Sequence, residues 1–289
     1  MPLDLDDARS RYAREGYWVA PVLFDAQEVA RFRDAGQRVV DGNYGGERPP
    51  TLSLPFDPTP HQLRKIDNAW WADTDLAALV TDARLGEIAA ALLAAASVRL
   101  WQDQLLWKPP SGGGESTTTI GWHQDWASWN TVASHGAFVT AWVAFDDVDD
   151  ENGAMQMIPG SHHWGLIEGA SNFFGTDRAA QLDALGDRAV VPTSVVMRAG
   201  QVSFHHPLTF HGSGENVSNR MRRSLAIHFV DGAVTAVSLP GIWQHYNLAL
   251  YLERGGQLGD PYRFEDVCPR VHARQVVGGS DGRGGPASS

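Results

Sequence analysis

The chain has 289 residues, 43% of them hydrophobic, which is enough for a substantial core; we find no clear linker and expect one domain. Its 34 acidic and 23 basic residues give a formal net charge of −11, which argues against a general nucleic-acid or anionic-membrane partner. The single cysteine, Cys268, excludes an intramolecular disulfide, so any metal site must be built from His, Asp and Glu.

The N-terminal third of the chain has helical patterns. The first residues, MPLDLDDARSRYAREG, lack the basic start and apolar run of a signal peptide, and no apolar stretch of 18 residues occurs; with the lone cysteine this favours a cytoplasmic protein without a membrane partner. We expect a helix over 4–15 and a short strand over 17–23. Asp25 and Glu28 resemble the capping pair of a second helix, AQEVARFRDAGQRVV.

A segment rich in Gly and Pro, residues 42–60, predicts a loop with little regular structure, long enough to cover an active site. Two further helices are expected in DTDLAALVTD and RLGEIAAALLAAA.

From residue 98 onward the pattern changes to short β-rich runs separated by Gly, Pro, Asn and Asp. The runs are VRLWQDQLLW, FVTAWVAFDDV, AMQMIP, TSVVMR, QVSFHH and RSLAIHFV. This predicts a mainly β protein with flanking helices and a jelly-roll core at about 98–230, within a single domain over 1–277. The tail GGSDGRGGPASS, residues 278–289, is low in complexity and is expected to be disordered.

The stretch GWHQDWASW places His123 and Asp125 two residues apart among tryptophans. On an extended segment both side chains point to the same side and can share a ligand. Because H-x-D often occurs by chance, the residues alone leave open a structural role in which Asp125 orients His123 or caps a turn.

A second segment, FHGSGENVSNRMRRSLAIHF, places His211 after one β run and an arginine pair at the start of the next. Alternation along the returning strand allows only one of Arg222 and Arg223 to face inward. A buried arginine needs an anionic partner, and its forked geometry suits a carboxylate. Two histidines and one carboxylate on one face of an octahedral ion form the triad of non-haem Fe(II) oxygenases, which leaves adjacent positions open for a cosubstrate and dioxygen.

Four segments in order resemble the phytanoyl-CoA dioxygenase family of Fe(II)- and 2-oxoglutarate-dependent oxygenases: QDQLLWKPP, WHQDW, NGAMQMIPGSHHWG and HGSGENVSNRMRR. The resemblance runs from about residue 16 to residue 229. It implies a double-stranded β-helix, a cupin-like jelly roll, with Fe(II), 2-oxoglutarate and O2 as cofactor and cosubstrates.

The resemblance also implies roles for individual residues. His123, Asp125 and His211 match the iron ligands of the family, and Arg222 matches the arginine that holds the far carboxylate of 2-oxoglutarate. Arg223 is the competing candidate for that arginine. Four further residues match positions that line the 2-oxoglutarate pocket, namely Ser213, Lys108, Trp142 and Gln104. For Trp142, a role in core packing is an equally good explanation. For Gln104, the equally good explanation is a polar strand residue whose hydrogen bonds are satisfied within the protein.

The remaining histidines have ordinary explanations. His206 reads as a strand-end residue, and neither it nor His205 has the G-S-G turn and following arginine. His162 is expected to stabilise its own loop, and His135 to lie in a loop near substrate or water. Trp126, Trp129 and Trp164 could line a substrate pocket, but tryptophans at this density are more often core residues.

The implied activity is hydroxylation, or another oxidation, of a small-molecule metabolite with release of succinate and CO2. Related halogenases replace the carboxylate ligand with a small residue, so the presence of Asp125 favours hydroxylation over chlorination. The alternatives are a non-oxidative metal-dependent isomerase or hydrolase and a non-catalytic binding protein on the same fold. A hydrolase has no stated need for Arg222 at its position, and loss of a ligand would mark a binding protein, whereas none of the three ligands is missing.

The sequence does not identify the substrate, because family resemblance does not choose among substrates. No basic cluster for a CoA diphosphate stands out. We expect substrate choice to depend on residues 42–60, 126–137 and 241–251.

Overall fold

The computed structural model describes residues 3–56, 59–112, 118–167, 169, 171–188, 190–239 and 245–273. The expected disordered tail, residues 278–289, lies outside these residues. Among the described residues, no helix has the length and apolar character needed to cross a membrane.

The predicted helices of the N-terminal third are present. The helices and 3-10 turns are α1 (Leu5–Glu15), α2 (Ala26–Val40), η1 (Ala69–Trp71), α3 (Thr74–Val80), α4 (Ala83–Leu93), α5 (Trp126–Trp129), η2 (Ser161–Trp164), α6 (Arg178–Asp183) and α7 (Tyr246–Glu253). The capping box before α2 forms as expected, with the Asp25 side chain accepting from Glu28 N and the Glu28 side chain accepting from Asp25 N. Gly16 ends α1 with a φ of 81°, where an added Cβ would lie 2.5 Å from the Thr209 hydroxyl.

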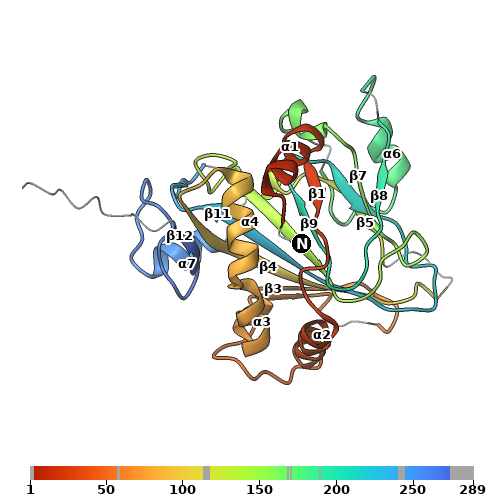
Figure 1. Ribbon diagram of the computed structural model, residues 1–289, viewed down its shortest axis with the longest axis horizontal. Coiled ribbons are helices and arrows are strands. Elements are labelled where there is room, and N and C mark those ends of the chain that lie inside the picture. The colour runs from red at the N-terminus through yellow and green to blue at the C-terminus, as the bar shows by residue number, and fades with distance from the viewer. Residues whose placement is uncertain are drawn as a thin grey trace, which may run out of the picture.

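Two antiparallel sheets follow from the β-rich runs (Figure 1). The larger has the order β1-β9-β6-β11-β4-β3-β2, with β12 also paired to β4, and the smaller has the order β5-β10-β7-β8. The strands are β1 (Tyr17–Val19), β2 (Leu52–Leu54), β3 (Arg64–Asp67), β4 (Ser97–Lys108), β5 (Ile120–His123), β6 (Phe138–Ala144), β7 (Met155–Met157), β8 (Thr193–Val195), β9 (Val202–His205), β10 (His211–Ser213), β11 (Arg222–Asp231) and β12 (Arg270–Ala273).

Two local expectations need correction. The strand expected over 17–23 ends at Val19, because its register with β9 stops there and Leu23 instead donates its backbone N–H to Gly200. The segment 42–60 is less irregular than expected, since β2 pairs with β3 and extends the larger sheet to its edge.

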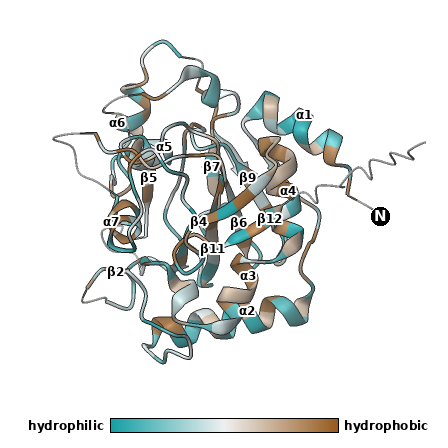
Figure 2. Cartoon of the chain, turned by 90° about the vertical axis from the view of Figure 1, so that its left-hand side faces the viewer, coloured by the Kyte–Doolittle hydropathy of each residue, from teal (hydrophilic) through white to brown (hydrophobic). Residues whose placement is uncertain are grey.

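Alternation along β4 and β11 gives the larger sheet two different faces. Leu105, Trp107 and Ile227 point to one face and pack with residues of α1–α4 in a single apolar cluster. Both hydrophilic and hydrophobic stretches occur along α1 and α2 in Figure 2, as expected for helices with one face in solvent. Leu106 and Ala226 point to the opposite face and cluster with Met155 and Met157 of the smaller sheet. This is the mainly β jelly roll with flanking helices predicted from the sequence, and its interior lies between the sheets.

Candidate metal centre and cosubstrate pocket

His123 and His211 face each other between two strands of the smaller sheet. The antiparallel register of β5 and β10 pairs them directly, and Asp125 follows two residues after His123, at the start of α5. Oδ1 of Asp125 lies 3.6 Å from Nε2 of His123 and 3.8 Å from Nε2 of His211. One ligand atom from each residue lies within 4.8 Å of the others, a spacing that can hold a metal ion.

Backbone carbonyls determine how both imidazoles are oriented. Nδ1 of His123 lies 2.9 Å from Gly121 O, and Nδ1 of His211 lies 2.9 Å from Thr209 O. A carbonyl can only accept, so each Nδ1–H donates and each Nε2 keeps its lone pair toward the centre. Burial lowers the pKa of both imidazoles, that of His211 to well below its usual value, which also favours the neutral ligand form.

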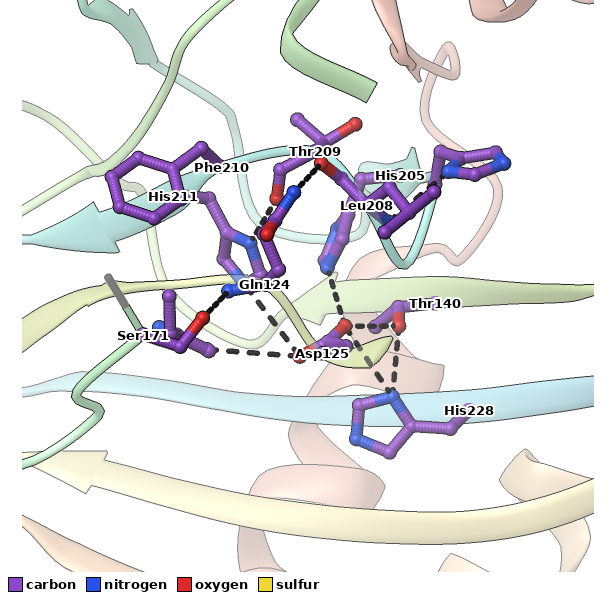
Figure 3. A network of polar contacts seen from close by, with 12 residues as sticks. Gln124, Asp125, Thr140, Ser171, His205, Leu208, Thr209, Phe210, His211 and His228 are labelled. Carbon is purple, nitrogen blue, oxygen red and sulfur yellow. Dashed lines mark hydrogen bonds and ion pairs between the residues drawn. The ribbon is translucent and has the colours of Figure 1, made fainter. Parts of the chain in front are cut away.

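Three residues of the larger sheet surround the other oxygen of Asp125 (Figure 3). Oδ2 accepts from the Thr140 hydroxyl at 2.9 Å and lies 3.3 Å from Nε2 of His205. Nδ1 of His228 lies 2.8 Å from the same hydroxyl. Burial alone would raise the pKa of Asp125, but neighbouring imidazoles, first that of His211, hold it well below its usual value. The carboxylate is therefore anchored through Oδ2 and presents Oδ1 to the two histidines.

The sequence interpretation did not identify Thr140, His205 or His228 as residues that surround the carboxylate of Asp125. The signal in the sequence was alternation, because His228 shares its face with Arg222. The pairing of His228 with Thr140 and of Thr140 with His205 depends on the order β9-β6-β11 in the sheet. That order cannot be read from the local sequence.

Arg222 points into the interior and Arg223 points away from it. Arg222 is 1% exposed; it donates to Gly153 O at 2.6 Å, and its Nε has no hydrogen-bond partner in the described part of the chain. Arg223 instead makes two hydrogen bonds to the carboxylate of Asp146, at 2.8 and 2.9 Å. Burial lowers the pKa of Arg222 to about 9. Among the residues that the structure describes, the inner arginine thus lacks the carboxylate partner that the outer one has.

Lys108 is a second buried basic residue on the same side of the sheet. Its ammonium lies 2.6 Å from the Ser213 hydroxyl and 2.5 Å from Gly214 O, and the side chain is fully buried. Asn216 holds the turn that carries these partners, since its amide donates to Lys108 O. Burial, and then the charge of Arg222, lower the pKa of Lys108 to well below its usual value. Among the described residues, no carboxylate forms an ion pair with Lys108 or Arg222.

One pocket joins the buried arginine to the three residues that could hold a metal ion. Besides His123, Asp125 and His211, its lining includes four of the residues predicted for the cosubstrate, namely Arg222, Ser213, Trp142 and Gln104. The guanidinium of Arg222 lies 5.3 Å from the centre of the Trp142 ring. Lys108 reaches this pocket through Ser213. An anion with one end at the metal position and the other at the cations would satisfy the unpartnered Nε of Arg222.

The other histidines lie outside the ligand set. Nε2 of His162 lies 3.0 Å from Ala13 O, which ties its loop to α1. Nδ1 of His206 accepts from Leu208 N at 3.1 Å, and burial lowers the pKa of His206 to about 4. His135 is exposed. Trp129 is buried in an apolar cluster, although its edge also lines a chamber beside Asp125.

The donor set fits Fe(II), because two neutral imidazoles and one carboxylate converge and leave the side toward Arg222 open. Comparison with known proteins agrees. The family model described as phytanoyl-CoA dioxygenase matches residues 12–224.

Individual relatives cover most of the chain. A probable alpha-ketoglutarate-dependent hypophosphite dioxygenase of Stutzerimonas stutzeri is 27% identical over 77% of this chain and 77% of its own length. An L-proline trans-4-hydroxylase of Streptomyces griseoviridis is 28% identical over 77% of this chain and 85% of its own length. The crystal structure of the non-heme alpha ketoglutarate dependent carbocyclase SnoK from nogalamycin biosynthesis aligns with a TM-score of 0.71 at 27% identity, covering 92% of this chain and 96% of that chain.

Proposed function

Because the chain belongs to the phytanoyl-CoA dioxygenase family, we propose that His123, Asp125 and His211 hold its Fe(II) and that Arg222 and Lys108 hold its 2-oxoglutarate. The protein is an Fe(II)- and 2-oxoglutarate-dependent dioxygenase. The non-oxidative isomerase, hydrolase and binding-protein alternatives are not supported by any of these relatives.

The observation that carries the residue assignment is the shared pocket. Three converging ligand atoms and a buried arginine without a carboxylate partner line the same cavity. A structural zinc site would have no use for the arginine, whereas a dicarboxylate bridging the metal and Arg222 uses both. Lys108 and Ser213 stand beside Arg222 as further donors to the far carboxylate.

The chain's own residues bind, orient and exclude water, while the iron with 2-oxoglutarate and O2 supplies the oxidising chemistry that yields succinate, CO2 and an oxidised substrate. Thr140 and His205 keep Oδ1 of Asp125 turned toward the histidines. Trp142 covers the guanidinium of Arg222 and shields its contact with the cosubstrate from water. Since Asp125 fills the carboxylate position, we assign hydroxylation or another oxidation rather than chlorination.

The substrate is a small or medium-sized metabolite. The named substrates of two relatives, hypophosphite and proline, are both small molecules. Beside the metal-ligating set lies a chamber of about 410 Å³, a volume typical of ligand pockets and far larger than hypophosphite requires. Residues from all three segments expected to govern substrate choice line it, for example Leu54, Ser128 and Tyr246.

The domain and its location are part of the same proposal. β1 and β12 belong to one sheet although they lie at opposite ends of the chain, which supports a single domain over 1–277. The lone cysteine, Cys268, is buried and burial raises its thiol pKa to about 12, which fits a cytoplasmic protein that uses no disulfide.

An anaerobic titration tests the assignment. Addition of Fe(II) and then 2-oxoglutarate to the metal-free protein should produce the weak visible metal-to-ligand charge-transfer band of a chelated keto acid. His211→Ala should bind neither and show no band, whereas His135→Ala, which alters an exposed histidine, should retain it. A band of full intensity in His211→Ala would refute the ligand set.

A further inference from the structure

The chamber beside Asp125 is a candidate substrate site with its own recognition chemistry. It shares Gln104, His123, Asp125 and Phe173 with the cosubstrate pocket, so the two cavities meet at the metal-ligating residues. A molecule held in the chamber would lie next to the metal. This inference rests on the proposed function, because it identifies the substrate class of the same site.

Gln102 faces this chamber with an amide that has no partner. The residue is 1% exposed, and neither its Oε1 nor its Nε2 makes a hydrogen bond to any residue that the structure describes. An amide offers two donors and one acceptor oxygen, and leaving them unmade in a buried place is costly. Gln102 lies on the inner face of β4, two residues before Gln104, and its side chain therefore points to the same side as those of Gln104 and Lys108.

The formal charges of the chamber are already matched. Lys65 is the one Lys or Arg among its described lining residues, and its ammonium lies 2.5 Å from Oδ1 of Asp67. Asp125 is assigned to the metal. His245 is neutral near pH 7, since burial lowers its pKa to about 3. A charged substrate would therefore have to break the Lys65–Asp67 pair or remain unpaired in a buried place.

The remaining walls present more apolar than polar surface, with hydroxyls contributed by Ser128, Ser171 and Tyr246. Leu52, Leu54, Trp129, Phe173 and Phe174 contribute hydrocarbon and aromatic surface around the polar floor formed by Gln102 and Gln104. Such walls suit the body of a ring-containing or branched molecule, whereas the floor suits one polar group on it.

We infer that Gln102 is a specificity-determining residue that hydrogen-bonds an uncharged group of the substrate able both to donate and to accept, such as a carboxamide, a lactam or a hydroxyl pair. The substrate accordingly carries this neutral group on a mostly apolar body. An anionic or cationic head group does not match the site.

The test uses three probes that share one fluorinated ring and carry a neutral, an anionic or a cationic head group of similar size: 4-fluorobenzamide, 4-fluorobenzoate and 4-fluorobenzylamine. Their dissociation constants are measured by 19F NMR with the protein loaded with 2-oxoglutarate and with Zn(II) as a diamagnetic substitute for Fe(II). The native protein should bind the amide about tenfold more tightly than either charged probe, because only the amide completes the Gln102 hydrogen bonds.

Variants at Gln102 make the test specific. Gln102→Leu should weaken amide binding about tenfold and remove the preference, and Gln102→Glu should shift the preference to the benzylammonium ion. Gln27→Leu, a change on the exposed face of α2, is the matched control and should bind as the native protein does.

The inference is overturned if the native protein binds either charged probe as tightly as the amide, if the amide fails to bind at millimolar concentration, or if Gln102→Leu leaves amide binding unchanged. The proposed function is tested separately, by the anaerobic charge-transfer band. Gln102→Leu should retain that band, because Gln102 is neither a metal ligand nor a cosubstrate contact. Loss of the band in the native protein would refute the proposed function whatever the probes do.

Discussion

The hydroxyl of Thr140 donates a hydrogen bond of 2.9 Å to Oδ2 of Asp125 and lies 2.8 Å from Nδ1 of His228. Since the hydroxyl proton is used toward Asp125, Nδ1–H of His228 donates to the hydroxyl oxygen. One threonine thus links the larger sheet to Asp125 and fixes which of its carboxylate oxygens faces the proposed metal position. Residues behind a metal ligand in this way commonly tune its affinity for the metal.

Thr140→Val keeps the shape of the side chain and removes the hydroxyl. Oδ2 of Asp125 then keeps its contact with His205 at 3.3 Å and a more distant one with Nδ1 of His228 at 4.0 Å, so we expect Fe(II) affinity to fall about tenfold. An anaerobic Fe(II) titration measures this. Thr193→Val, on an exposed position of β8, is the control and should bind Fe(II) normally. Unchanged affinity in Thr140→Val would show that the hydroxyl does not position Asp125.

Arg222→Ala and Arg223→Ala separate the two faces of β11. Arg222→Ala should raise the KM for 2-oxoglutarate about a hundredfold, which corresponds to the loss of a charged two-point contact of roughly 3 kcal/mol. Arg223→Ala should leave that KM unchanged and lower the free energy of unfolding by less than about 1 kcal/mol, because its bond to Asp146 is partly exposed. The reverse pattern in steady-state kinetics would contradict the assignment of Arg222.

Lys108 makes 2-oxoglutarate binding depend on pH. Burial holds its pKa well below the unfolded value of about 10.4, so the folded protein without cosubstrate binds fewer protons than the unfolded chain in the window between these two pKa values. Stability of that form should therefore rise with pH through the window. A bound dicarboxylate favours the ammonium, so binding takes up a proton and affinity should fall as pH rises.

Calorimetry in buffers of different ionisation enthalpy measures the proton uptake on 2-oxoglutarate binding. Lys108→Met, which keeps much of the side-chain length without the charge, should show no uptake and weaker binding. Equal proton uptake in Lys108→Met and the native protein would assign the proton to another group.

Gly153→Ala should weaken both the fold and the cosubstrate pocket. Gly153 has a φ of 77°, and an added Cβ would lie 2.8 Å from Glu215 O and 3.0 Å from the Lys108 ammonium. Gly42→Ala is a matched control, because its φ is 76° and nothing lies within 4 Å of its added Cβ. In both variants, backbone strain should lower the free energy of unfolding by about 1 kcal/mol. In a denaturant titration, only Gly153→Ala should show a larger loss of unfolding free energy, and only this variant should raise the KM for 2-oxoglutarate. Equal losses of unfolding free energy in the two variants would show that the close approach of the added Cβ to Glu215 O and Lys108 is unimportant.

Local patterns in the sequence determined several features by themselves. The capping box of Asp25 and Glu28 is visible because its residues lie three positions apart, and α2 begins where it predicts. The opposite directions of Arg222 and Arg223 follow from alternation along one strand. The H-x-D pair and the ordered motifs were sufficient to identify the family, since these signals lie within short stretches of chain.

The tertiary structure determined which residues meet in the interior, which alternation along single strands cannot determine. Lys108 meets Ser213 across 105 positions, and Asp125 meets His205 across 80, because two sheets stack with a particular strand order and register. The chamber that Gln102 faces is closed by segments near residues 52, 128 and 245, which are far apart in the chain. Periodicity reports which face a side chain occupies, but only the pairing and stacking of strands determine which residues meet there.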